Sequence, residues 1–223
     1  MLFKSQILTQ ASGSVGGITA SRNRGGPYFR ARSLVVNPNS PAQVVVRSIM
    51  SNLVERWATT LTAAQRASWD LYAFNVPLIG PTGDPRNVGG IGMYVRANVP
   101  RLRAALSRVD TAPSIFSEAE TPAVSAFTAS SGGPGGDGVT ITVSNMPSDG
   151  RLLLQVGRPQ NPSVGFYKGP FVFVGSSGAS PLTVPNAGLP VPVLAGSRWF
   201  GRARYTLDDG RLGPAVIVTS IAT

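Results

Sequence analysis

The chain has 223 residues, 42% of them hydrophobic, and it carries 20 basic and 10 acidic side chains but no histidine or cysteine. This length suits one large domain or two small ones. The missing residue types exclude disulfides, thiolate metal sites and every catalytic pair that uses histidine or cysteine. We therefore expect a protein that is not an enzyme and that holds no cofactor.

The positive charge is concentrated in the first half of the chain. Residues 1–111 contain 13 basic and 4 acidic side chains, whereas residues 112–223 contain 7 and 6. The first carboxylate is Glu55, and only Lys4 and Lys168 are lysines. Arginine is preferred where a planar cation is buried against carboxylate, phosphate or aromatic groups. The bias towards arginine leaves two explanations open, a role in contacts and a GC-rich genome.

Targeting and membrane segments are not expected. No apolar run reaches about 18 residues, the length that a membrane-spanning helix needs. The opening residues MLFKSQILTQASGS lack the continuous apolar stretch of a secretory signal. Glycines and a proline between residues 13 and 27 interrupt the amphipathic helix of a transit peptide.

Residues 1–39 are predicted to form an extended basic arm. Glycine, proline, asparagine and serine recur there at intervals too short for the core of a helix or a strand. Two adjacent aromatic side chains lie in this segment without a local core, so we expect them to anchor on another surface or to stack on bases. The partner-binding candidates are Arg22, Arg24, Tyr28, Phe29, Arg30 and Arg32.

Residues 40–111 are predicted to be a helical region. Ser40 as N-cap and Pro41 at the first helical position begin a helix that ends near Thr59. Thr62 and Gln65 match a capping box that opens a second helix and completes a helical hairpin. A third stretch, residues 91–106, is interrupted by proline at position 100. The helical spacing predicts an apolar face on the first helix and core tryptophans: Val46, Ile49, Met50, Leu53, Val54, Trp57 and Trp69.

Residues 112–122 are predicted to form a linker, and residues 123–223 are predicted to form a β domain. Seven short runs rich in valine, isoleucine, threonine and aromatic residues follow one another, separated by turns such as MPSDG and LDDGR. Seven strands in about 100 residues are typical of a seven-stranded immunoglobulin- or fibronectin-like β-sandwich. The predicted fold class is therefore α+β, with an arm, a helical hairpin region and a β-sandwich.

The carboxylate pairs and glycine-rich motifs of the sequence are explained by turns and linkers better than by catalysis or phosphate binding. Glu118 and Glu120 lie in the linker, and Asp208 and Asp209 lie in a predicted hairpin turn, so neither pair indicates acid–base catalysis. The sequences GSVGG and NVGGIG resemble phosphate loops but lack the preceding strand and the lysine of such loops. An anion at the start of the helix after NVGGIG stays open as the weaker alternative.

A series of motifs runs from residue 13 to residue 73. It comprises a Gly-Gly turn, Arg-Asn-Arg-x-Gly, Arg-x-Arg, Asn-Pro-x-x-Pro-x-Gln and Leu-Thr-x-x-Gln-Arg-x-x-Trp. This series resembles a recurrent N-terminal pattern of virion structural proteins encoded by phages and prophages. The resemblance implies a structural role in a virus particle and brings no catalytic residues with it.

The expected function follows from the arm and the resemblance. We expect a bacteriophage virion protein, made in the bacterial host cytoplasm, that serves as a head decoration or cement protein. Its arm staples neighbouring capsid or tail subunits, and the protein is a homo-oligomer or bound to a lattice, without a membrane partner. Two alternatives stay open: a tail or head–tail connector component, and a nucleic-acid-binding protein whose arm contacts the packaged genome.

Overall fold

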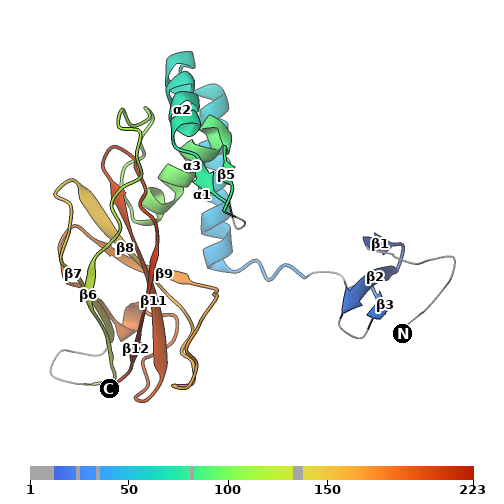
Figure 1. Cartoon of the computed structure of the whole chain (residues 1–223), viewed down its shortest axis with the longest axis vertical. Helices are drawn as coiled ribbons and strands as arrows, with labels where there is room; N and C mark the ends of the chain where they lie inside the picture. The colour runs from blue at the N-terminus through green and yellow to red at the C-terminus, as the bar shows by residue number, and fades with distance from the viewer. Residues whose placement is uncertain (1–12, 24–25, 34–35, 81–82, 133–137) are drawn as a thin grey trace. The chain divides into compact units, whose positions relative to one another are not determined.

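The chain is an α+β protein that divides into two compact units, Met1–Pro41 and Ala42–Thr223 (Figure 1). The computed structural model describes residues 13–23, 26–33, 36–80, 83–132 and 138–223. These residues contain three α-helices and twelve strands, and every strand pairing is antiparallel. Within these ranges, none of the helices combines the length and apolar character that crossing a bilayer requires.

The N-terminal unit contains a three-stranded sheet in the order β1-β2-β3, which we call the N-terminal sheet. Its strands are β1 Gly13–Val15, β2 Ile18–Asn23 and β3 Gly26–Ala31. The expectation that this arm has no strands is therefore wrong. Glycines at 16 and 17 form the turn between β1 and β2, and Gly16 takes a φ of 56° that glycine adopts without strain. A two-residue turn lets very short strands pair directly, so the glycines delimit strands here and do not prevent them.

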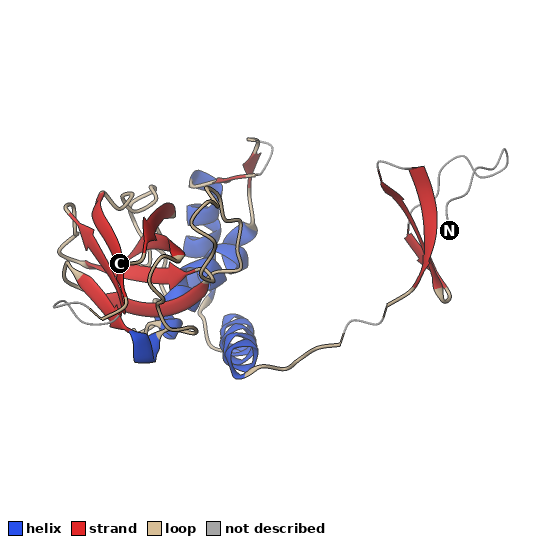
Figure 2. Cartoon of the chain, turned by 90° about the horizontal axis from the view of Figure 1, so that it is seen from below, coloured by secondary structure: helices blue, strands red, loops and turns tan. Residues whose placement is uncertain are grey.

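Three helices of the second unit lie together beside its strands (Figures 1 and 2). They are α1 Pro41–Thr59, α2 Ala63–Asn75 and α3 Gly89–Arg103, with the short pair β4 Leu78–Ile79 and β5 Pro85–Arg86 between α2 and α3. The predicted capping box is confirmed: the Gln65 amide donates to Thr62 Oγ1 at 3.2 Å, and the Thr62 amide donates to Gln65 Oε1 at 2.9 Å.

The helices share a core built around aromatic side chains. Trp69 is fully buried, as predicted, and its ring lies 5.6 Å from that of Tyr94 in an edge-to-face arrangement. Trp57 is partly buried against the same cluster. The predicted apolar face of α1 is only partly correct, because Met50 and Val54 are exposed. The other helices cover only a narrow stripe of α1, and Leu53 is its one fully buried described residue.

Two antiparallel sheets follow α3. One has the order β10-β7-β6 and the other the order β12-β11-β8-β9. Buried side chains from both sheets belong to a single apolar cluster that includes Ile141, Leu152, Trp199 and Tyr205. The strands are β6 Val124–Ser130, β7 Gly138–Val143, β8 Gly150–Val156, β9 Val172–Ser177, β10 Leu182–Pro185, β11 Arg198–Leu207 and β12 Val216–Ile221, with a short 3-10 helix at Asn186–Gly188.

A buried arginine joins the helices to the strands. Arg101 of α3 is only 3% exposed, and its guanidinium donates to the carbonyl oxygens of Ser107, at 2.9 Å, and Leu207 at the end of β11. A carboxylate oxygen of Asp208 lies 3.7 Å from Nη2. The buried cation is thus satisfied mainly by backbone carbonyls, and it ties α3 to one end of β11.

The segment after α3 is held by Asp110. Its backbone carbonyl accepts a hydrogen bond from Trp69 Nε1 at 2.9 Å, and its carboxylate lies 3.0 Å from Arg56 Nη2. The hydrogen bond from Arg56 holds the pKa of Asp110 below its ordinary value of 3.8. Asp110 therefore connects the chain after α3 to both α1 and α2.

Candidate interaction surface

The N-terminal sheet places apolar side chains on one face. In the register of the sheet, Ile18 lies opposite Val15 on one side and opposite Ala31 on the other, while Ala20 lies opposite Phe29. Residues directly opposite one another in an antiparallel pair share a face, and residues two apart along a strand do so as well. We call this surface the apolar face: Val15, Ile18, Ala20, Phe29 and Ala31.

The other side of the same sheet is polar. Thr19 lies opposite both Ser14 and Arg30, and Ser21 lies opposite Tyr28. The hydroxyl groups of Ser14 and Thr19 are 2.8 Å apart, so a hydrogen bond crosses between β1 and β2 on this side. We call this surface the polar face: Ser14, Thr19, Ser21, Tyr28 and Arg30.

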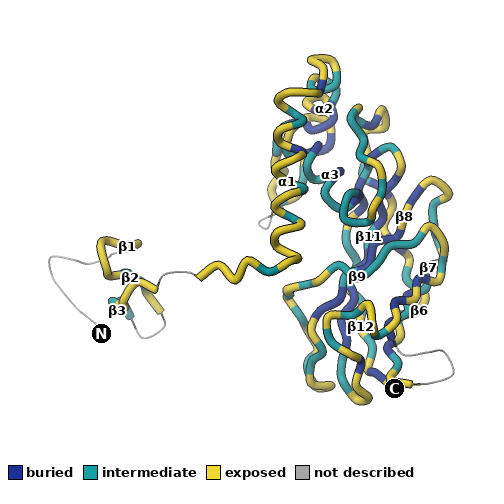
Figure 3. The backbone as a smooth tube through the Cα atoms, turned by 180° about the vertical axis from the view of Figure 1, so that it is seen from behind, coloured by how far each residue is buried: buried dark blue, intermediate teal, exposed yellow. Residues whose placement is uncertain are grey.

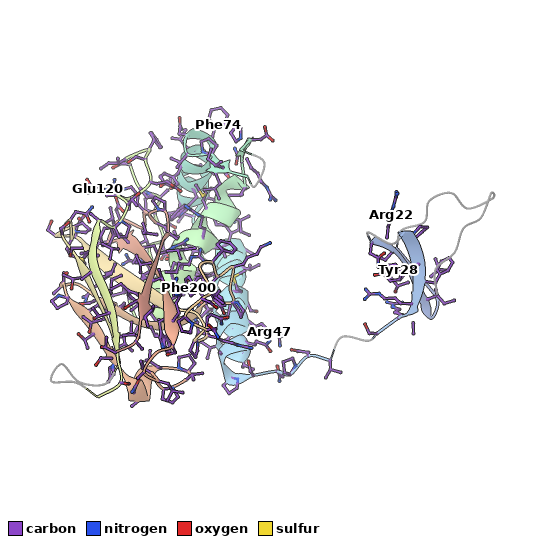
Figure 4. The ribbon with its side chains drawn as sticks, turned by 60° about the horizontal axis from the view of Figure 1, so that its bottom comes forward. Arg22, Tyr28, Arg47, Phe74, Glu120 and Phe200 are labelled. Carbon is purple, nitrogen blue, oxygen red and sulfur yellow. The ribbon has the colours of Figure 1, made fainter. Side chains whose placement is uncertain are left out.

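The structure separates the partner-binding candidates instead of gathering them. Tyr28 belongs to the polar face with Arg30, whereas its neighbour Phe29 belongs to the apolar face. Arg22 lies opposite Pro27 near the end of β2, on the side of the apolar face; Figure 4 labels Arg22 and Tyr28 on the sheet.

Two further candidates complete the set. The backbone amide of Arg32, just after β3, donates to the Gly17 carbonyl at 2.8 Å, while Arg24 lies outside the described residues. The described arginine side chains of this unit are all exposed: Arg22, Arg30 and Arg32.

The N-terminal sheet has no core of its own in the described residues. None of the residues described between 13 and 41 is buried, and Figure 3 shows these strands as exposed or intermediate. Val15 is 86% exposed and Ile18 is 54% exposed. A small sheet gains much of its stability by burying an apolar face. Val15 and Ile18 are therefore the large exposed side chains of the apolar face, which a further surface can cover.

Sequence reasoning missed Val15 and Ile18. The sequence signal that identifies them is the Gly-Gly turn between them, because a two-residue hairpin places the flanking residues directly opposite each other. Alternation along β2 then adds Ala20 to the same face.

One carboxylate of each pair in the sequence forms a close ion pair with an arginine. Glu118 Oε1 lies 2.7 Å from Arg96 Nη2, and Asp209 Oδ2 lies 2.6 Å from Arg211 Nε. Among the described residues, no three histidine, cysteine, aspartate or glutamate side chains gather closely enough to hold a metal ion. The ion pairs indicate a structural role for Glu118 and Asp209.

An internal carboxylate occupies the start of α3, where an external anion was the weaker alternative. The Gly90 amide donates to Asp70 Oδ1 at 3.0 Å. A Cβ atom at position 90 would lie 2.7 Å from the Asp70 backbone nitrogen, so only glycine fits this close approach of α3 to α2. Gly90 of NVGGIG thus serves the packing of α3 against α2.

Comparisons of the chain with protein-family models, with curated proteins and with solved structures find no match.

Proposed function

We propose that this chain is a non-enzymatic structural protein of a bacteriophage particle, a head decoration or cement protein. Its N-terminal sheet staples neighbouring capsid subunits by docking its apolar face onto them. The observation that carries the proposal is a sheet with one apolar and one polar face but no buried described residue. A neighbouring subunit covers the exposed Val15 and Ile18, so the sheet gains stability on assembly.

Docking of the apolar face contributes a substantial free energy of burial. Complete burial of the exposed parts of Val15 and Ile18 contributes roughly 3 kcal/mol, and Phe29 and the two alanines add to it. Stable interfaces bury on the order of 1,000 Å² or more, which a docked sheet with its flanking chain can reach.

Charge selects the partner surface. Residues 1–41 carry five basic side chains and no acidic one, and the described arginines among them are exposed. Such a charge at the rim of an apolar contact favours an acidic partner and speeds encounter more than it adds affinity. A tail or head–tail connector subunit with an acidic surface fits the same description, and it remains the alternative within this class.

For the C-terminal strands we propose an immunoglobulin- or fibronectin-like sandwich of seven strands. Its support is the grouping of β6 to β12 into a three-stranded and a four-stranded antiparallel sheet with one shared apolar cluster. In a cement protein this module sits on the particle while the N-terminal sheet reaches a neighbour.

A nucleic-acid-binding protein is the second candidate. Tyr28 and Arg30 lie on the same face of β3, two residues apart. An aromatic ring beside a guanidinium is a surface on which bases stack and phosphates pair. This candidate uses the polar face, whereas the stapling function uses the apolar face, so one pair of variants separates them.

The test compares Ile18→Asp with Thr19→Asp. Both variants add one negative charge to β2 at adjacent positions, but on opposite faces of the sheet. We expect Ile18→Asp to weaken binding of the purified chain to particles that lack it by at least tenfold, at low and at high salt. Thr19→Asp retains binding. Co-sedimentation with the particles measures both.

Other outcomes decide against stapling. If Thr19→Asp loses binding, and affinity for duplex DNA falls with salt at a log–log slope of about −0.9 per neutralised phosphate, the nucleic-acid candidate is correct. If both variants bind particles as the unaltered chain does, neither face of the N-terminal sheet is the contact and the proposal is wrong.

A further inference from the structure

A pocket of about 250 Å³ lies between α3 and the outer side of the four-stranded sheet. Its apolar walls include Val95 and Val99 from α3, Leu153 from β8 and Phe173 from β9. A cavity of ~150 Å³ holds one benzene ring, whereas pockets for drug-sized ligands begin at about 300 Å³. The pocket therefore suits a single side chain or a small molecule and is too small for a nucleotide.

Three arginines line this pocket, and they come from two elements. Arg96 and Arg103 lie on α3, and Arg204 lies on β11. Arg96 pairs with Glu118 at 2.7 Å. The guanidinium carbon of Arg103 lies 5.2 Å from the centre of the Phe173 ring, in a cation–π contact. The described residues that line the pocket include no carboxylate.

Arg204 is partly buried, and the charge of Glu118 compensates that burial only in part. Its Nε is buried and has no hydrogen-bond partner in the described part of the chain. Burial, assisted by the nearby charges of Arg202 and Arg96, lowers the pKa of Arg204 to about 10, and burial also lowers that of Arg103. A buried donor without a partner costs free energy that a bound acceptor recovers.

We propose that this pocket binds a carboxylate whose apolar body lies against Val99 and Phe173. The carboxylate belongs either to a small organic acid or to a glutamate side chain of a partner segment. The planar fork of a guanidinium matches the two oxygens of a carboxylate, and Arg103 and Arg204 are the two arginines of the pocket that form no ion pair with a described carboxylate. The apolar walls favour this singly charged group over the more strongly hydrated phosphate.

Thermal unfolding of the full chain tests the ligand class. We expect benzoate to raise the Tm by about 3 °C at roughly ten times its Kd, while benzamide, its neutral counterpart, leaves the Tm unchanged. The peptide acetyl-Ala-Glu-Leu-amide tests whether the carboxylate comes from a glutamate side chain of a partner segment. A larger shift with the peptide at equal concentration assigns the site to a partner's side chain, and a larger shift with benzoate assigns it to a small acid.

Variants test the two arginines. Arg103→Gln and Arg204→Gln each abolish the benzoate shift, whereas Arg158→Gln, an exposed arginine outside the pocket, retains it. Without ligand, Arg204→Gln has a Tm equal to or above that of the unaltered chain, because it removes a partly buried charge whose Nε has no described hydrogen-bond partner.

Four results would overturn the proposal. They are a lower Tm of ligand-free Arg204→Gln, equal shifts with benzoate and benzamide, an equal shift with inorganic phosphate, and no shift with either carboxylate at concentrations on the order of 10 mM.

Discussion

Replacing Trp69 by alanine lowers the free energy of unfolding of the second unit by about 4 kcal/mol. Trp69 is fully buried between α2 and α3, its ring contacts those of Tyr72 and Tyr94, and its Nε1 donates to the Asp110 carbonyl. Alanine leaves a large cavity and an unpaired carbonyl, and both effects destabilise the helical core. Urea unfolding followed by circular dichroism measures the loss.

Phe74 is the matched control for Trp69. It lies on the same helix five residues later, but it is 75% exposed. Phe74→Ala changes the free energy of unfolding by less than about 0.5 kcal/mol. Similar losses for the two alanine variants would contradict the assignment of Trp69, but not Phe74, to the core.

Arg101→Ala is the second variant with a large expected effect, a loss of about 3 kcal/mol. The change removes a buried guanidinium, leaves the Ser107 carbonyl without its guanidinium donor, and leaves the Leu207 carbonyl with the Gly210 amide alone. Because the bond to Leu207 joins α3 to β11, the helices and the strands also lose their cooperative unfolding. Separate transitions for near-UV and far-UV circular dichroism would reveal that uncoupling.

Asp208, the acidic neighbour of Arg101, supplies the control for Arg101→Ala. Asp208 is 70% exposed and lies 3.7 Å from Arg101, so Asp208→Asn costs less than about 1 kcal/mol. If Asp208→Asn matches Arg101→Ala in cost, the ion pair holds the two regions together, and the backbone carbonyls do not.

Local signals in the sequence predicted much of the second unit. Proline at position 41 marks the first residue of α1, and the Thr62–Gln65 capping box marks the start of α2. These signals act within a few residues, so they do not depend on the rest of the fold. Trp69 was also predicted as core, because its burial follows from helical spacing.

Features that depend on distant contacts were not predicted. Met50 and Val54 have the right spacing for a core face, yet neither α2 nor α3 reaches far enough around α1 to cover them. The pocket brings Arg103 together with Arg204, a hundred positions further along the chain, through the packing of α3 on the sheet. No pattern within a single element carries that information.

For the N-terminal unit, the prediction from the sequence fails for a different reason. Frequent glycines predict the absence of strands here, although a Gly-Gly pair between Val15 and Ile18 is a hairpin signal. Tyr28 and Phe29 are neighbours in the sequence, but adjacent residues of a strand point to opposite faces. Recognition of the strand therefore divides the candidates between an apolar and a polar surface.

Amide hydrogen exchange of β2 and β3, in the free chain and in assembled particles, tests the stapling function most directly. A sheet with no buried residue among those described opens at little cost, so we predict rapid exchange across β2 and β3 in the free chain. In particles the same amides exchange at least about 100-fold more slowly, because a neighbouring subunit covers the apolar face. Equal exchange in the two states would contradict the proposal that a neighbouring subunit covers the exposed Val15 and Ile18 of the N-terminal sheet.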